Sequence, residues 1–300
     1  MAESSNPNPE KNMSFNLNAK NSFKTKHSIA ALSDSDFNPL GVAMVDVNEK
    51  GFEITVRNSL TDAAGNLFLK SSGLNDFHCN TPIINKMINL NEISEILFNT
   101  GIKETISVFH LNGSNHLSFI LGSAPTKEMS VEFLETDEVL AKFPDVEFSC
   151  EAGLKTSTLR EMIDQLNKIN GLQLVSVNIA ESEVTIFVGL EPPWEYEIGD
   201  ADENFEARLL TEDKQHHAWF ESRHVESMKK ASILATRFHL RFLTEPSKHV
   251  MMRFNLQELG ELVFILKAVL IVKNPDRVSL DDDGAPSTEQ LARMTSALKG

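Results

Sequence analysis

Apolar residues recur along the chain at two different spacings, and these predict both helices and strands. Leu90, Ile93 and Leu97 lie three and four residues apart, which places them on one face of a helix. Leu159, Met162 and Leu166 repeat that pattern in the second half of the chain. On this basis, and with weaker patterns at either end, helices are expected over residues 20–32, 90–98, 158–169 and 224–234.

Strands are predicted where apolar and polar residues alternate, or where short apolar runs are bounded by turn residues. In the first half they cover residues 42–47, 52–56, 67–70, 105–111 and 116–121. In the second half they cover residues 175–179, 184–188, 194–198, 205–210, 237–243, 250–256 and 262–272. Residues 80–85 are expected to interrupt the strands. The long apolar run 262–272 is predicted to be a buried strand because Val and Ile dominate it.

The order of helix and strands in the first half returns in the second half. The segment VSVNIAESEVTIFV, from Val175, echoes VDVNEKGFEITV, from Val45. A repeat period of about 130 residues indicates a tandem duplication. We therefore expect an α+β fold of two similar domains, with helices on one face of antiparallel sheets. The predicted divisions are a disordered segment 1–12, domains at 13–123 and 147–273, a connector at 124–146, and a flexible acidic tail at 274–300 with a short helix candidate at 287–298.

Charge limits the way in which this chain could contact nucleic acid. It has 28 Lys and Arg against 43 Asp and Glu, a formal net charge of −15. A protein that grips DNA through its whole surface needs clustered Lys and Arg, so this class is disfavoured, whereas a local basic face is compatible. No apolar run reaches the roughly 20 residues of a membrane span, and the start of the chain lacks the apolar core of a signal peptide. A soluble intracellular protein without a membrane partner is expected.

Motifs for catalysis are missing from the sequence. There is no Gly-rich phosphate loop, no GxSxG elbow and no paired CxxC. His216 and His217 are adjacent, as are His78 and Cys79, and adjacent side chains of a strand point to opposite faces. We therefore expect no catalytic residues, no metal site, no cofactor and no enzymatic activity. A deep pocket that gathers His216 or Cys150 with carboxylates would reverse this expectation.

Four segments, in order, resemble the eukaryotic sliding clamp family, the PCNA type. These are LFLKSSGLNDFHCN (67–80), INLNEISEILFNTG (88–101), FPDVEFSCEAGLKTSTLREMIDQLNKI (143–169) and RFNLQELGELVFIL (253–266). The similarity extends over roughly residues 13–270. It implies the DNA clamp fold, in which three two-domain subunits close into a ring, with sheets outside and helices around duplex DNA. Implied partners are DNA polymerases and other clamp-binding proteins, and a clamp loader ATPase.

The resemblance also assigns residues to three surfaces. The DNA-facing set is Lys20, Lys24, Lys26, Lys103, Lys155, Arg160, Lys168, Arg223, Lys229 and Lys230. The partner-peptide pocket set is Phe133, Leu134, Leu140, Ala141, Phe143, His249, Ile265 and Ala268. The subunit-interface set is Lys127, Ser130, Val131, Trp194, Tyr196 and Ile198. The alternative for the basic residues is a solvated helix face, and for the pocket residues ordinary core.

Departures from the family pattern leave three functions open. Glu161 and Asp164 stand where the second-domain helix usually carries basic residues, and Lys267-Ala268 replaces an expected Ala-Pro pair. The preferred reading is a nuclear homotrimeric clamp, acting as a polymerase processivity factor in replication and repair. The alternatives are a subunit of a heterotrimeric DNA-damage checkpoint clamp and a viral-type processivity factor that holds DNA without a closed ring. The oligomeric state separates the first two.

Overall fold

The computed structural model describes sixteen stretches of the chain, which form two units. The described residues are 13–19, 22–35, 37–58, 63–98, 101, 104–122, 126–135, 147–168, 174–180, 183–188, 194–199, 206–210, 215–222, 227–243, 249–268 and 270–273. Unit 1 comprises Met1–Arg57, Gly65–Lys142 and Leu256–Leu262. Unit 2 comprises Asn58–Ala64, Phe143–Asn255 and Val263–Gly300. Each unit is described by itself.

Unit 1 consists of antiparallel strands with two helices. Its elements are β1 (Met13–Ala19), α1 (Ser22–Leu32), β2 (Val42–Asn48), β3 (Gly51–Asn58), β4 (Ala63–Lys70), β5 (Asp76–Cys79), β6 (Ile83–Asn89), α2 (Leu90–Phe98), β7 (Ile106–Leu111), β8 (His116–Leu121) and β9 (Lys127–Leu134). Neighbouring strands follow the orders β5-β1-β7-β8-β9 and β4-β3-β2-β6. Strand β9 changes partner along its length, since Glu132 is opposite His116 of β8, whereas Phe133 is opposite Ile88 of β6.

Unit 2 repeats this arrangement. Its elements are β10 (Phe148–Lys155), α3 (Thr156–Leu166), β11 (Leu174–Ala180), β12 (Glu183–Val188), β13 (Trp194–Gly199), β14 (Glu206–Leu209), β15 (Gln215–Glu221), η3 (Ser227–Ile233), β16 (Arg237–Leu243), β17 (His249–Asn255), β18 (Gly260–Lys267) and β19 (Leu270–Lys273). Neighbouring strands follow the orders β14-β10-β16-β17-β18 and β13-β12-β11-β15-β19.

The two strand orders match element by element. Strand β1 pairs with β5 and β7, and β10 pairs with β14 and β16. Strand β2 pairs with β3 and β6, and β11 pairs with β12 and β15. A helix follows the first strand of each unit. The predicted α+β fold of two similar domains is confirmed, and the shared pairing pattern supports the tandem duplication.

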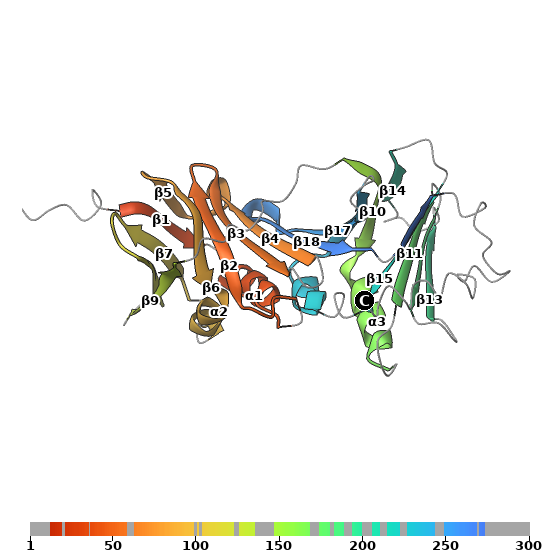
Figure 1. The fold of residues 1–300 in the computed structure, drawn as a ribbon, viewed down its shortest axis with the longest axis horizontal. Coiled ribbons are helices and arrows are strands. Elements are labelled where there is room, and N and C mark those ends of the chain that lie inside the picture. The colour runs from red at the N-terminus through yellow and green to blue at the C-terminus, as the bar shows by residue number, and fades with distance from the viewer. Residues whose placement is uncertain are drawn as a thin grey trace, which may run out of the picture. The chain divides into compact units, whose positions relative to one another are not determined.

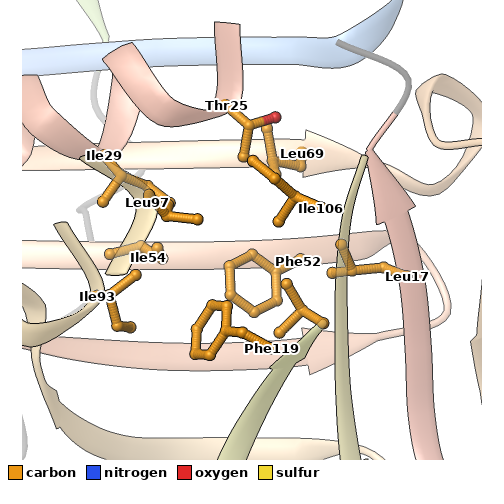
Figure 2. A pocket seen from close by; sticks show the side chains of 11 residues that line it. Leu17, Thr25, Ile29, Phe52, Ile54, Leu69, Ile93, Leu97, Ile106 and Phe119 are labelled. Carbon is orange, nitrogen blue, oxygen red and sulfur yellow. The ribbon is translucent and has the colours of Figure 1, made fainter. Parts of the chain in front are cut away.

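Helices α1 and α2 pack together on the strands of unit 1 (Figure 1). Helix α2 buries Leu90, Ile93, Ile96 and Leu97, the residues whose spacing predicted it. Figure 2 shows the interior that results, where Ile29 of α1, Leu97 of α2 and Phe119 of β8 surround a cavity of about 10 Å³. Its lining is apolar apart from Thr25. A volume near that of one water, almost without polar partners, is a packing defect of the core and not a ligand site.

Helix α3 and η3 form the corresponding pair in unit 2. Leu159, Met162, Ile163 and Leu166 of α3 are buried. Hydrogen bonds attach the start of α3 to the segment between η3 and β16. The Thr156 hydroxyl donates to the Ala235 carbonyl at 2.8 Å, and the Thr156 amide donates to the Thr236 carbonyl at 3.0 Å. A helix leaves its first four amides without partners of its own, and the bond to Thr236 satisfies one of them in α3, which has no side-chain cap.

Residues 256–262 belong to unit 1 and require a glycine. Gly260 has a φ of +143°, and a Cβ at this position would lie 1.9 Å from the Phe68 carbonyl oxygen. An L side chain would therefore collide with the backbone of β4. The Leu256 amide donates a hydrogen bond to the Gly260 carbonyl at 2.9 Å.

Two predicted elements are corrected in form. The helix expected over residues 224–234 is a 3-10 helix where it is described, at Ser227–Ile233, and the Leu234 amide bonds to the Ala231 carbonyl three residues earlier. The strand expected over residues 262–272 is two strands. Strand β18 neighbours β17, whereas β19 pairs with β15, so the chain breaks after Lys267 in order to change sheets.

The expected interruption at residues 80–85 is wrong at its end, because β6 begins at Ile83. Asn85 has a φ of +55°, and its amide donates to the Asp46 carboxylate at 2.6 Å. The register with β2 shifts between Val45 and Val47. This β-bulge breaks the alternation of buried residues, which is why the pattern did not indicate a strand.

Candidate nucleic-acid interface

The helices do not share the acidic excess of the whole chain. As far as they are described, α1, α2, α3 and η3 contain five basic residues, Lys24, Lys26, Arg160, Lys229 and Lys230, and four acidic residues, Glu92, Glu95, Glu161 and Asp164. The difference is a net charge of +1, compared with −15 for the whole chain. A surface of this composition repels phosphates far less than the average surface of the protein does.

Both lysines of α1 are tied to neighbouring backbone within unit 1. The Lys24 ammonium donates to the Leu256 carbonyl at 3.2 Å and to the Gln257 side-chain oxygen at 3.0 Å. The Lys26 ammonium donates to the Phe98 carbonyl at 2.7 Å and lies 5.3 Å from the centre of the Phe98 ring. Lys26 therefore joins α1 to α2 and Lys24 joins α1 to residues 256 and 257, while both add positive charge to the surface.

Helix α2 adds no positive charge to this surface. Glu92 and Glu95 are exposed, and the Glu92 carboxylate accepts a hydrogen bond from the Asn89 side chain at 2.9 Å. Phe98, at the last position of α2, is 76% exposed. Within α1, burial and the nearby Lys26 charge lower the pKa of His27, which keeps this imidazole neutral near pH 7.

In unit 2 the basic and acidic residues are interleaved. Arg160, Glu161 and Asp164 of α3 are all exposed. The Arg160 Nε donates to the Thr156 carbonyl at 3.3 Å. Asp164 pairs with Lys229 of η3 at 3.7 Å, so one of the departures noted in the sequence neutralises one of the predicted DNA-facing lysines. Both groups are more than half exposed, so the pair contributes little to stability.

The remaining predicted DNA-facing residues are distributed as follows. Lys230 and Lys168 are exposed, and the Lys168 ammonium donates to Gln165 at 3.1 Å. Lys155 ends β10 and alternates with the buried Leu154, so it lies on the sheet face opposite the core. Lys20, Lys103 and Arg223 lie outside the described residues.

The partner-pocket residues fall into buried and exposed groups. Phe133 is buried in unit 1, with its ring centre 5.5 Å from that of His110 and 5.8 Å from the Lys86 ammonium. Leu134, the next residue, is 41% exposed. Phe133 therefore serves the core, which leaves Leu134 as the apolar residue that unit 1 presents at the end of β9. Leu140, Ala141 and Phe143 lie outside the described residues.

In unit 2 the sequence identified only part of an apolar cluster. Ile265 packs with Met251 and Val263, and the half-buried Phe148 lies against them. These residues alternate with the core-facing residues of their strands, so they lie on the opposite face of the sheet. Ala268 is buried and His249 is half-buried. Met251, Val263 and Phe148 were missed because the same alternation also predicts an ordinary strand.

The predicted subunit-interface residues lie on β9 and β13. Lys127 and Ser130 are exposed, whereas Val131 is buried. Within the described part of the chain β13 pairs only with β12, from Glu183 opposite Gly199 to Val188 opposite Trp194. Its outer edge is thus an unpaired row of backbone groups, the geometry that another strand can extend. The side chains of Trp194, Tyr196 and Ile198 lie outside the described part.

The buried histidine and cysteine of unit 2 are engaged in packing. His217 stacks on Trp219 with ring centres 3.8 Å apart, and its Nε2 lies 2.5 Å from the Ser176 hydroxyl. Burial lowers the pKa of His217 to about 4 and raises the pKa of Cys150 to about 12. Both groups are therefore neutral at pH 7, and His216 of β15 is also buried. In the described stretches no three His, Cys, Asp or Glu side chains are grouped as a metal site would need. Nor is any described helix long and apolar enough to cross a membrane.

Comparison with solved structures settles the fold. Over 85% of this chain and 99% of the other, the structure is similar to the Proliferating Cellular Nuclear Antigen of Entamoeba histolytica, with a TM-score of 0.71 and 15% sequence identity. The fold is that of a PCNA-type sliding clamp. A PCNA2-PCNA3 complex from Sulfolobus tokodaii is equally similar, with a TM-score of 0.71 and 11% identity over 84% of this chain and 98% of that one. No protein-family model matches the sequence, and no curated protein does.

Proposed function

We propose that this chain is one subunit of a DNA sliding clamp, a ring that encircles duplex DNA and holds other proteins on it. The observation that carries the proposal is the presence of both copies of the clamp unit, in a chain whose likeness extends over 99% of the Entamoeba histolytica clamp. In this proposal the protein is a nuclear scaffold without enzymatic activity. It would serve a polymerase, repair proteins and a loader ATPase.

Electrostatics support a topological mode of DNA binding. A closed ring stays on DNA without tight contacts, so its lining needs only to avoid repelling the phosphates. The helices, with a net charge of +1, meet that condition in a chain of −15. Direct gripping of the backbone would require a much more basic surface. The exposed Arg160, Lys168 and Lys230 are the described residues that we assign to weak phosphate contacts.

A second candidate is a subunit of a ring made from different clamp chains, as in a checkpoint clamp. The strands predicted to join subunits favour it, because β9 carries Glu128 and Glu132 and β13 carries Glu195 and Glu197. Pairing β9 of one copy with β13 of another would place carboxylates near carboxylates, which destabilises a sheet. A sister chain with basic edges would remove this repulsion. One of the similar solved structures is itself a complex of two different chains, PCNA2 and PCNA3.

Light scattering on the purified protein separates these candidates. A homotrimeric ring gives about three times the 33.5 kDa mass of one chain. A subunit of a mixed ring stays below that mass alone and reaches it when it is copurified with sister chains from its source. A protein that is monomeric alone and also fails to associate with any clamp-fold chain would contradict both forms of the closed-ring proposal and leave the ring-less alternative.

A further inference from the structure

One sheet face of unit 2 has an excess of positive charge, in contrast to the net negative charge of the whole chain. On neighbouring antiparallel strands, the side chains of residues directly opposite each other point to the same face of the sheet. Glu151 lies between Arg208 of β14 and Arg241 of β16, Lys155 is opposite Arg237, and His239 is opposite Arg253. The other face of these strands bears the buried Cys150, Ala152, Leu154, Phe238, Leu240 and Phe242.

We call this surface the arginine face. Its basic residues are Lys155, Arg208, Arg237, Arg241 and Arg253, and its carboxylates are Glu151 and Glu206. The excess is three positive charges, apart from His239, within a chain whose net charge is −15. This face is therefore opposite in charge to the chain as a whole, and it attracts anions.

Arg241 is held in place from two sides. Its Nη2 lies 2.9 Å from the Glu151 carboxylate, and its guanidinium carbon lies 4.6 Å from the centre of the Phe148 ring. The His239 Nδ1 lies 3.1 Å from the same oxygen of Glu151. Only 19% of the Arg241 side chain is exposed. The guanidinium thus lies along the sheet with a fixed orientation, and less conformational entropy is lost when it binds a ligand.

Arg237 crosses the face in a similar way, and a glycine makes this possible. Its Nη2 donates to the Gly153 carbonyl at 3.1 Å, and its Nη1 lies 3.7 Å from the Glu206 carboxylate. A Cβ on Gly153 would lie 3.0 Å from both the Arg237 Nη2 and the Glu206 Oε2. The glycine therefore leaves the space through which the guanidinium reaches from β16 across β10 to β14.

The duplicated unit shows that the clamp fold does not require this face. In unit 1 the corresponding strands are β1 and β7, where Asn18 is opposite Ser107 and Asn16 is opposite Phe109. On β5, Asp76 and His78 are opposite Asn18 and Asn16. Within the described strands β1, β5 and β7, Lys and Arg do not occur on the matching face. The arginines are a property of unit 2 and not of the sheet.

We propose that the arginine face binds an acidic peptide segment of a partner protein, in an extended conformation. Four strands about 4.8 Å apart, and rows of side chains about 6.7 Å apart, give a patch of about 14 by 13 Å. That is the length of four or five extended residues, whose same-side carboxylates also recur every 6.7 Å or so. Guanidinium groups bind carboxylates through paired hydrogen bonds, and Arg241 already makes one hydrogen bond to a carboxylate oxygen of Glu151.

A peptide suits this surface better than duplex DNA does. The patch covers less than half of one DNA turn, which is about 34 Å, so a duplex lying on it would extend well beyond the arginines. The guanidinium groups of Arg237 and Arg241 also lie against the sheet, with side chains 28% and 19% exposed. A chain in contact with the sheet reaches them, whereas the rigid backbone of a duplex meets them less closely. The inference holds whether or not the chain encircles DNA.

Fluorescence anisotropy with a labelled octapeptide of alternating Glu and Thr tests this proposal. The wild-type protein should bind the peptide at low ionic strength and lose affinity as salt is added. Arg208→Glu with Arg253→Glu should weaken binding at least about tenfold, since two attractions become repulsions. The neutral pair Arg208→Gln with Arg253→Gln should weaken peptide binding less than the charge reversal does. It tests the same two positions if the charge-reversed protein does not fold.

The matched control is Lys50→Glu with Lys70→Glu, which changes net charge equally at two exposed positions of unit 1. It should leave binding within about twofold of the wild type, because both lysines lie outside the arginine face. Equal weakening by the control and the test pair would overturn the proposal, as would unchanged binding in both arginine pairs. A labelled duplex that binds better than the peptide, and depends on Arg208 and Arg253, would assign the face to DNA instead.

Discussion

A lysine of the helices can contribute both to surface charge and to folding stability. Lys26 was predicted to face DNA, and its ammonium also caps the carbonyl of Phe98 at the end of α2. A cation at this end of a helix is stabilised by the helix dipole and by the unpaired carbonyls. Replacing Lys26 therefore changes folding stability as well as surface charge, so a loss of DNA retention in such a variant would be ambiguous.

Lys26→Met should lower the free energy of unfolding by about 0.5–1 kcal/mol, because one charge-assisted hydrogen bond at the end of α2 is lost. Urea unfolding followed by circular dichroism measures this. Lys50→Met, in the exposed turn between β2 and β3, removes the same charge without such a bond from its ammonium and should stay within about 0.3 kcal/mol of the wild type. Equal stability of the two variants would contradict the capping role of Lys26.

The two cysteines should differ in reactivity. Cys150 is fully buried, and burial raises its pKa to about 12, whereas the partly exposed Cys79 has a pKa that burial and Glu49 also raise. The thiolate is the reactive form. A chromogenic disulfide reagent at pH 8 should modify one thiol slowly in the native protein and a second only in denaturant. In Cys79→Ser the native protein should not react; rapid labelling of that variant would mean that Cys150 is accessible.

At the scale of elements, the sequence predicted best where one face alone is buried. Helix α2 has the predicted bounds, 90–98, because its four buried residues lie on a single face. Strand β15 was not predicted, since the residues from His216 to Phe220 are all buried and show no alternation. Strand β6 was obscured by the bulge at Asn85. Burial on two faces and bulges depend on contacts between distant segments, which no local pattern contains.

His217, on strand β15, makes the folding stability of unit 2 depend on pH. His217 has a pKa of about 4 in the folded protein and 6.5 in the unfolded chain, so the unfolded chain binds more protons between these values. Its contribution to stability is complete above pH 6.5 and is lost as the pH falls toward 4. The loss amounts to about 3 kcal/mol. In His217→Gln the slope of unfolding free energy against pH should be smaller in this window. Parallel pH profiles of the variant and the wild type would contradict a neutral, buried His217.

The candidate surfaces were less predictable than the fold. The basic residues of α1 and η3 could be found in the sequence, but the pairing of Lys229 with Asp164 and the bonds of Lys24 could not. These depend on how two helices lie side by side. The arginine face was also hidden, because Arg208, Glu151 and Arg241 are far apart in the chain and become neighbours only through the strand register.

At the scale of the whole molecule, we propose that DNA is held by topology, a mode that suits two copies of one unit and a nearly neutral set of helices. A protein held in this way should leave DNA through its ends. A protein held by contacts should stay on a duplex whether or not its ends are free. Salt should weaken the second kind of binding strongly and the first kind only slightly.

Retention on circular and linear DNA therefore tests the central claim most directly. The protein, with its copurifying sister chains and loader fraction, would be loaded on a nicked circular plasmid and washed in high salt. Half of the sample would then be cut once by a restriction enzyme. We predict retention on the circles and release of the protein after cutting. Equal retention on circular and linear DNA, or release of both by salt alone, would contradict the sliding-clamp account.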